Sequence, residues 1–212
     1  MYTLGSPLAF LIKNKDYENW RAYMAPEGCD VTQRALTRVR PGHADLTGML
    51  KYGTDDARNI LERASARETA ARVVAGTIAR QYLRRLGIEA CGYVKSVCGI
   101  SDDSHYEFEQ LSAAKGQPLF MLDNALQDKA VALVDELKAK GDTAGGIVEV
   151  RIKGLKSGFG SCMQYSTKLD AILCSALMSV QAVKGVEVGL GFSAAALAGS
   201  KVHDEIFYDG KY

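Results

Sequence analysis

The stretch that most constrains the fold is residues 55–87, because its pattern predicts one long helix. It contains no proline and only one internal glycine, Gly76. Apolar residues recur in it at helical spacing, and Asp55 and Gly87 are suited to begin and end a helix. Its middle is rich in Ala, Ser and Thr, which let another backbone or a flat ligand approach closely. We therefore expect a helix at the centre of the fold.

Shorter patterns on either side predict a mixture of strands and further helices. Apolar or alternating runs predict strands at residues 8–13, 88–100, 147–152 and 186–188, and helical spacing predicts helices at 126–137 and 169–180. Segments expected to hold little regular structure are 14–28, 34–51 and 101–118. A GxGxxG turn and a Walker motif are both absent from the sequence, which argues against a Rossmann or P-loop fold. We expect an α+β fold with sheets packed on central helices, and a single domain over residues 1–212.

The charge balance and the cysteines limit the partners and the compartment. The formal net charge is +1, so no global positive field favours nucleic acid or an acidic membrane surface. The apolar run at residues 7–12 is too short to cross a bilayer. Five cysteines without a CxxC pair are typical of a reducing compartment. We therefore expect a cytoplasmic protein with no nucleic-acid or membrane partner.

A histidine among arginines is the strongest candidate for catalysis. Residues 40–45, RPGHAD, place His43 close to Arg40 in a stretch with further cations. An imidazole can give or take a proton near neutral pH, and the cations could hold an anionic substrate beside it. We predict that His43 is a general acid. The alternative is a loop histidine that bonds only its own turn.

A second candidate is the pair Arg63 and Arg67, four residues apart in the predicted long helix, with Ser65 between them. On one helix the two arginines share a face, where like charges repel each other. A phosphate or carboxylate ligand could compensate them, with the Ser65 hydroxyl as a further contact. On spacing alone, a solvated face is equally compatible, because Glu62 with Arg58 and Glu68 with Arg72 make ordinary i,i+4 pairs.

The remaining histidines, His105 and His203, indicate no site. Neither has a histidine, cysteine or carboxylate at a recognised metal-ligand spacing. We predict no metal ion in this protein.

Three long motifs resemble those of the chorismate synthase family. They are residues 40–53 (RPGHADLTGMLKYG), 61–73 (LERASARETAARV) and 178–189 (MSVQAVKGVEVG), in the family's order. Residues 3–7 (TLGSP) and 168–171 (KLDA) also fit, so the resemblance runs through nearly the whole chain. It implies a β-α-β sandwich with antiparallel sheets packed on a helical core.

The resemblance also implies a lyase of the shikimate pathway and aromatic amino acid biosynthesis. Family members eliminate phosphate and a ring hydrogen from 5-enolpyruvylshikimate 3-phosphate, in the 1,4-anti sense, to give chorismate. They require reduced FMN although the net reaction is redox-neutral. They form homotetramers and obtain reduced flavin from a separate reductase or, in bifunctional relatives, with NADPH. Because this sequence has no separate nicotinamide-binding domain, we expect an external reductase.

The resemblance assigns roles to individual residues of the first two motifs. His43 would protonate the reduced flavin. Three residues match the segment that contacts FMN and three match the substrate side: Arg63, Ala64 and Ser65 for FMN, and Arg40, Ala66 and Arg67 for the substrate. Both ligands carry phosphate, which agrees with the anion-binding argument from the arginines.

Some of the family's motifs are not found in this sequence. The Gly-Glu-Ser-His-Gly motif and an arginine-rich segment near the family's start are missing, as are the Asn-Ala-Gly-Gly type loop, the Lys-Pro-rich segment and the Arg-x-Asp-Pro motif near its end. Two of these carry proton-transfer groups in the family. We therefore expect a chorismate synthase with impaired activity or, alternatively, an inactive fragment that keeps the fold and binds FMN or phosphate ligands weakly.

Overall fold

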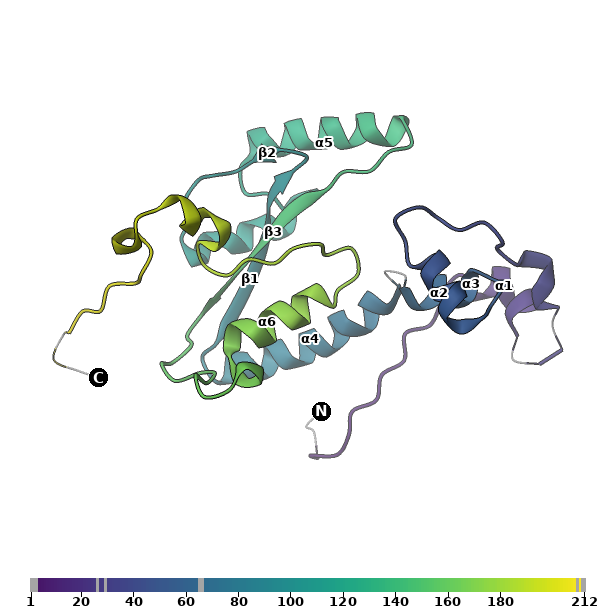
Figure 1. The fold of residues 1–212 in the computed structure, drawn as a ribbon, viewed down its shortest axis with the longest axis horizontal. Coiled ribbons are helices and arrows are strands. Elements are labelled where there is room, and N and C mark those ends of the chain that lie inside the picture. Colours follow the sequence, from purple (N-terminus) through teal and green to yellow (C-terminus); the bar gives the residue numbers. More distant parts are fainter. Residues whose placement is uncertain (1–3, 26, 29, 65–66, 209, 211–212) are drawn as a thin grey trace. The chain divides into compact units, whose positions relative to one another are not determined.

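The computed structural model describes residues 4–25, 27–28, 30–64, 67–208 and 210. The chain divides into two compact units, Met1–Ala75 with Gly160–Tyr212, and Gly76–Phe159. The single domain expected over residues 1–212 stays a prediction. Helices combined with a small antiparallel sheet confirm the predicted α+β class (Figure 1).

The elements of the two units are as follows. The first unit contains α1 (Tyr17–Met24), η1 (Val31–Arg34), α2 (Asp45–Tyr52), α3 (Arg58–Ala64), η3 (Tyr165–Thr167), α6 (Leu169–Met178), η4 (Gly191–Ala196) and η5 (Gly199–Lys201). The second contains β1 (Glu89–Val97), β2 (Ile100–Ser101), η2 (Phe108–Gly116), α5 (Asn124–Ala139) and β3 (Gly146–Lys153). Helix α4 (Arg67–Arg85) begins in the first unit and ends in the second. No helix in the described ranges is long and apolar enough to cross a membrane.

The second unit is built on a three-stranded antiparallel sheet with the order β2-β1-β3. Strand β1 pairs with β3 along almost all of its length, with Tyr93 opposite Glu149. The strands predicted at 88–100 and 147–152 are thus confirmed. Both segments are rich in β-branched residues, which fit the pleated surface of a sheet.

One end of β1 packs on η2 and the other on α5. Cys91 and Tyr93 of β1 pack against buried side chains of η2, while Val97 of β1 packs with Ala130 of α5. Helix α5 confirms the helix predicted at 126–137, because its apolar stripe faces this core.

Helix η2 corrects the expectation of little regular structure at 101–118. The backbone N–H of Glu107 donates to the side-chain oxygen of Gln110 over 2.6 Å, as part of a capping box. A capping box satisfies backbone donors that the first turn of a helix leaves unpaired. The Glu-x-x-Gln spacing is therefore the signal that marks the start of this element.

Helix α1 corrects the same expectation for residues 14–28. The indole Nε1 of Trp20 donates to Asp16, just before the helix, over 2.7 Å. The Arg34 guanidinium, from η1, lies 4.8 Å from the ring centre of Trp20 and 4.4 Å from that of Tyr23. None of the residues of α1 is buried. Cation–π contacts of this kind therefore hold the helix in place.

Helix α2 corrects the expectation for residues 34–51. Pro41 and Gly42 lie in a turn, as expected, but the helix begins directly after that turn. It ends at Gly53, which has φ of 62° and donates its backbone N–H to the carbonyl of Met49. A glycine in the left-handed region is a common way to end a helix.

Two short strands that we predicted are not formed. Residues 8–13 and 186–188 have no strand assignment in the structure. A strand needs a neighbouring strand for its backbone hydrogen bonds, and apolar composition alone does not supply one. The helix predicted at 169–180, in contrast, is confirmed as α6.

The long helix predicted at 55–87 is seen as α3 and α4, on either side of positions 65 and 66, which lie outside the described residues. The residue at its start is also different from the one we predicted. Asp56, not Asp55, accepts the backbone N–H of Arg58 through its side chain, over 3.0 Å. Asp56 also accepts the backbone N–H of Leu36 over 3.0 Å, so it ties the preceding loop to the start of α3.

Gly48 lets α2 approach α3 closely. A Cβ at this position would lie 2.5 Å from Cγ2 of Ile60 in α3. We expect Gly48→Ala to lower the free energy of unfolding by about 1–3 kcal/mol, the usual cost of overpacking. Gly199→Ala, in the same unit, meets nothing within 4 Å and should be nearly neutral in the same denaturant titration. Equal stability of the two variants would contradict this packing.

Candidate functional site

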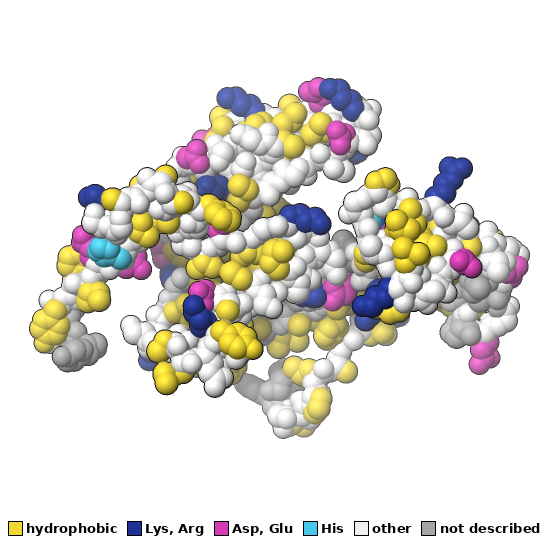
Figure 2. All heavy atoms as spheres, in the orientation of Figure 1, with side chains coloured by type: hydrophobic (Ala, Val, Ile, Leu, Met, Phe, Trp, Pro, Cys, Tyr) yellow, Lys and Arg dark blue, Asp and Glu magenta, His cyan; other side chains and the backbone are white. Residues whose placement is uncertain are grey.

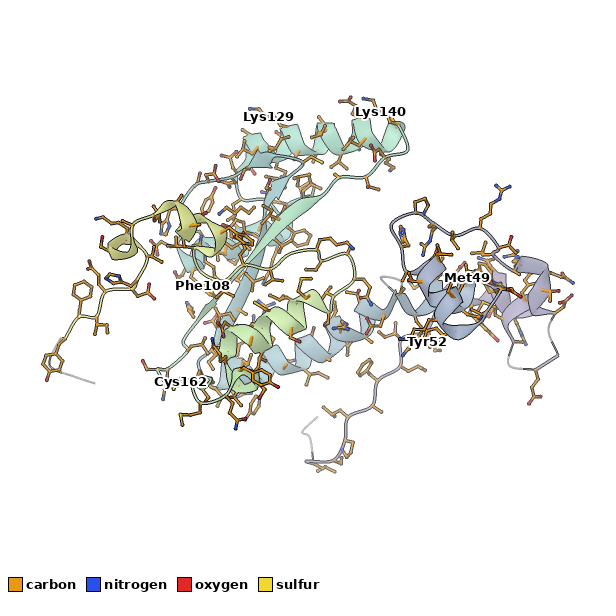
Figure 3. All side chains as sticks on the ribbon, viewed as in Figure 1. Met49, Tyr52, Phe108, Lys129, Lys140 and Cys162 are labelled. Atoms are coloured by element: carbon orange, nitrogen blue, oxygen red, sulfur yellow. The ribbon has the colours of Figure 1, made fainter. Side chains whose placement is uncertain are left out.

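A pocket of about 510 Å³ lies where α2 ends and α3 runs past it. Its lining combines an aromatic ring, polar groups, apolar side chains and one cation: Tyr52, Thr54, Asn59, Ile60, Arg63 and Ala64. Tyr52, labelled in Figure 3, is the last residue of α2. Pockets of a few hundred Å³ with mostly apolar walls and a few polar groups are typical of small-ligand sites.

The turn between α2 and α3 fixes the polar wall of this pocket. The backbone N–H of Thr54 donates to the Met49 carbonyl over 3.2 Å. The Thr54 hydroxyl accepts the side-chain amide of Asn59 over 2.9 Å and the backbone N–H of Asp56 over 3.3 Å. The left-handed glycine at the end of α2 makes this sharp turn possible, and the two polar side chains hold each other in one arrangement.

Arg63 supplies the positive charge of the pocket. It stands near the end of α3 and is exposed. Its guanidinium makes no hydrogen bond and no ion pair with any residue that the structure describes. An arginine whose donors are unused can bind a phosphate or carboxylate through two parallel hydrogen bonds.

His43 lies in the turn before α2 and is exposed. Its Nδ1 atom is 3.0 Å from the Pro41 carbonyl, and its backbone N–H donates to the Arg40 carbonyl over 3.4 Å. The bond to its own turn is the one expected of a loop histidine. A ring that donates from Nδ1 to a carbonyl keeps Nε2 for other chemistry, so this contact is compatible with both readings of His43.

Arg40 is held by Asp45 through three hydrogen bonds. The guanidinium donates from Nε and Nη2 over 2.9 Å each, and the backbone N–H of Arg40 donates over 3.0 Å. Hydrogen bonding from Arg40 lowers the pKa of the Asp45 carboxyl to about 2, from an ordinary value of 3.8. The Asp45 side chain is only 1% exposed, whereas that of Arg40 is 43% exposed. Asp45 therefore fixes the position of the Arg40 guanidinium, while part of the Arg40 side chain remains exposed to solvent.

The Arg40–Asp45 pair makes the first unit sensitive to acid. The pKa of Asp45 is lower in the folded than in the unfolded state. The ion pair therefore contributes to the free energy of unfolding above about pH 4, and this contribution is lost as the pH falls toward 2. We expect Asp45→Asn to cost about 1 kcal/mol at pH 6, since solvent screens the exposed arginine. Denaturant titrations should show the difference between wild type and Asp45→Asn shrinking between pH 4 and pH 2. A difference that stays constant over this range would contradict the assignment.

The structure brings some of the predicted site residues together and leaves others apart. Arg63 and Ala64 line one pocket, as expected of neighbours that bind the same ligand. His43 and Arg40 do not belong to that lining. Ser65 and Ala66 lie outside the described residues. Arg63 lies in α3 and Arg67 is the first residue of α4, with the two undescribed positions between them.

One of the two predicted ion pairs near these arginines is confirmed. Glu68 and Arg72 form an i,i+4 pair over 3.1 Å. Arg58 is buried and pairs with Asp56 over 2.8 Å, and the pair expected between Arg58 and Glu62 stays a prediction. The pairing with Asp56 follows from Asp56 being the residue that begins α3.

Four residues of the pocket were missed by sequence reasoning: Tyr52, Thr54, Asn59 and Ile60. Tyr52 falls inside the first motif, directly before the glycine that ends α2. Thr54 and Asn59 lie between the first two motifs and carry no residue pattern of their own. Only the turn that joins α2 to α3 brings them to the pocket.

The second and third motifs meet at the start of α4. Gln181, just past α6, donates its side-chain amide to Glu68 over 2.6 Å and accepts the Thr69 hydroxyl over 3.4 Å. Arg72 donates to the Ser179 hydroxyl over 2.8 Å. Segments more than 100 positions apart in sequence therefore hold the first turns of α4 in place.

Known proteins resemble this chain along nearly its whole length. The sequence profile of the family described as chorismate synthase matches residues 1–211. A chorismate synthase from Pelobacter propionicus is 53% identical over 98% of this chain, and one from Alkaliphilus metalliredigens is 48% identical over 97%. A crystal structure of chorismate synthase, 39% identical, superposes with a TM-score of 0.73 over 78% of this chain and 52% of its own. The chain spans 53% and 54% of the two relatives, or about half of their length.

Proposed function

The chain belongs to the chorismate synthase family, and we propose that it catalyses, with reduced FMN, the 1,4-anti elimination of phosphate from 5-enolpyruvylshikimate 3-phosphate to give chorismate. The observation that carries this proposal is the pocket between α2 and α3. It places the exposed Arg63, which forms no hydrogen bond or ion pair with the residues that the structure describes, beside aromatic and apolar side chains. That combination suits a ligand with a flat ring system and a phosphate group.

The lining of the pocket fits FMN by its chemistry. The ring of Tyr52 and the apolar side chains of Ile60 and Ala64 offer surfaces to a flat ring, and Arg63 offers charge to a phosphate. In the family, Arg63, Ala64 and Ser65 match the residues that contact the cofactor. Reduced FMN, when bound, supplies the transient electron that lets phosphate leave.

The roles of the other residues follow from family membership and from their positions. His43 is proposed to hold and deliver a proton at Nε2, because Nδ1 is engaged by its own turn. Arg40, fixed by Asp45, is proposed to bind the substrate with its solvent-exposed side. Ala66 and Arg67 are proposed to line the substrate side of the same site. We propose no metal ion, and the described residues hold no group of three metal-ligating side chains.

The proposal extends to partners and location. Reduced flavin would come from an external reductase, as it does for many members of the family. We further propose a cytoplasmic homo-oligomer, which is a tetramer in the family.

A second function is favoured by one specific observation. His43 and Arg40 are not among the residues that line the pocket with Arg63. A protein with a flavin or phosphate pocket but without an assembled proton-transfer set would bind the ligand without turning substrate over. Anaerobic release of phosphate from 5-enolpyruvylshikimate 3-phosphate in the presence of reduced FMN distinguishes the two. Flavin binding without phosphate release would support the binding function and contradict the lyase.

A further inference from the structure

A carboxylate, that of Glu68, lies near the arginine of the pocket. Glu68 stands in the first turn of α4, five positions after Arg63. Hydrogen bonds from Arg72 and Gln181 lower the pKa of the Glu68 carboxyl, and the charges of Arg72 and Arg63 lower it further. Figure 2 shows acidic side chains interspersed with basic ones on the visible face. A carboxylate within reach of a guanidinium competes with an anionic ligand for it, so Glu68 would oppose phosphate binding unless it is held elsewhere.

Two side chains hold the Glu68 carboxylate in another direction. Arg72, one turn further along α4, donates from Nε to both carboxylate oxygens over 3.1 Å each. Gln181 donates from Nε2 to Oε2 over 2.6 Å. Among the residues that the structure describes, Glu68 therefore forms its ion pair with Arg72 and not with Arg63.

Both partners of Glu68 are themselves fixed by further contacts. The Thr69 hydroxyl donates to Oε1 of Gln181 over 3.4 Å, and Nη1 of Arg72 donates to the Ser179 hydroxyl over 2.8 Å. These bonds join the end of α6 to the first turns of α4, which lie side by side (Figure 1). Directly after Gln181, Ala182 has φ of 69°. A residue with a Cβ keeps such a conformation only where its surroundings hold it, so the backbone that carries Gln181 is well determined.

We infer that Gln181 is a positioning residue of the ligand site: it holds the Glu68 carboxylate on Arg72, so that the Arg63 guanidinium stays open to the phosphate group of FMN. The inference rests on the proposed binding of FMN at the pocket. Gln181 does not line that pocket and acts on it through Glu68. An amide suits this role because it donates a hydrogen bond to the carboxylate without adding a charge that would itself bind the ligand.

A double-mutant cycle in the full chain tests this role, with FMN affinity measured by quenching of flavin fluorescence. Gln181→Leu should weaken FMN binding by about 2- to 5-fold, because the released Glu68 pairs with Arg63 and this exposed ion pair must break before the ligand binds. Glu68→Gln alone should bind FMN at least as tightly as wild type. In the Glu68→Gln background, Gln181→Leu should have no effect, because a neutral amide does not compete for the guanidinium. Gln164→Leu, at an exposed position of the same unit, is the matched control and should keep the wild-type affinity.

The outcomes separate this inference from the proposed function. Unchanged affinity in Gln181→Leu would overturn the inference and leave the FMN pocket standing. A loss that is equally large in the Glu68→Gln background would also overturn it, because Gln181 would then support the fold and not the direction of the carboxylate. A wild type that binds no FMN would refute the proposed function and this inference with it. Circular dichroism checks folding, and if Gln181→Leu does not fold, Gln181→Asn, whose amide is one methylene shorter, runs through the same cycle with the same expected results.

Discussion

Replacing His43 with glutamine is expected to slow phosphate release by about 10²–10⁴-fold, the usual contribution of a general acid or base. Glutamine keeps a polar side chain of similar reach but cannot exchange a proton near neutral pH. Flavin affinity should change little, because His43 does not line the pocket that contains Arg63. The measurement is the anaerobic rate of phosphate release with reduced FMN, alongside a flavin titration of the same variant.

The matched control for this variant is His105→Gln. His105 is another exposed histidine, in a polar segment of the second unit to which we assign no function. Its replacement should leave the rate unchanged. If His43→Gln retains the wild-type rate, His43 is a loop histidine that only bonds its own turn, and its proposed role is wrong.

Replacing Arg63 with alanine is expected to weaken the binding of FMN by about 10- to 100-fold, because hydrogen bonds to charged groups contribute about 1.5–3 kcal/mol each. The effect should be large here since the guanidinium forms no other ion pair among the described residues. Its loss should also reduce the salt dependence of binding, because that dependence comes from the charge. Quenching of flavin fluorescence measures both quantities.

Arg84→Ala is the control for the flavin titration. Arg84 lies in the last turn of α4, within the second unit, and is also exposed. It should bind flavin as the wild type does. Equal loss of affinity in both variants would indicate a general electrostatic effect, and unchanged affinity in Arg63→Ala would mean that the ligand does not use this pocket.

Much of the second unit could be predicted from local sequence pattern. Alternation in the strand at 147–152 and the apolar stripe of the helix at 126–137 both report a face that packs and a face that does not. These elements pair or pack with partners in the same unit. The apolar run at 8–13 shows the limit of the same reasoning, because a strand exists only where another strand receives its hydrogen bonds.

The helices that we missed depend on side-chain contacts more than on periodicity. Helix α1 is held by the stacking of Arg34 on Trp20 and Tyr23, which connects residues beyond the helix itself. Helix α2 begins directly after a Pro-Gly turn, so the turn residues concealed its start. Polar or proline-bearing composition therefore led us to expect irregular structure where short helices form.

Part of the candidate site could likewise be predicted from sequence motifs, and part depends on tertiary contacts. The second motif led us to predict Arg63 and Ala64 as site residues, and both line the pocket. The cluster of arginines did not reveal that Arg40 forms an ion pair with Asp45. Any carboxylate within reach competes with a ligand for a guanidinium, and the cluster alone does not show which carboxylate is near. Contacts such as Gln181 with Glu68 come from tertiary structure, and no local spacing reveals them.

The central claim is that this chain turns over substrate at a site that combines the pocket with His43. Phosphate release from 5-enolpyruvylshikimate 3-phosphate by the full chain, measured anaerobically with and without reduced FMN, tests it most directly. We predict release that requires reduced FMN, gives chorismate in equal amount and is lost in His43→Gln. Saturable flavin binding with no phosphate release, or release that does not need flavin, would contradict the account.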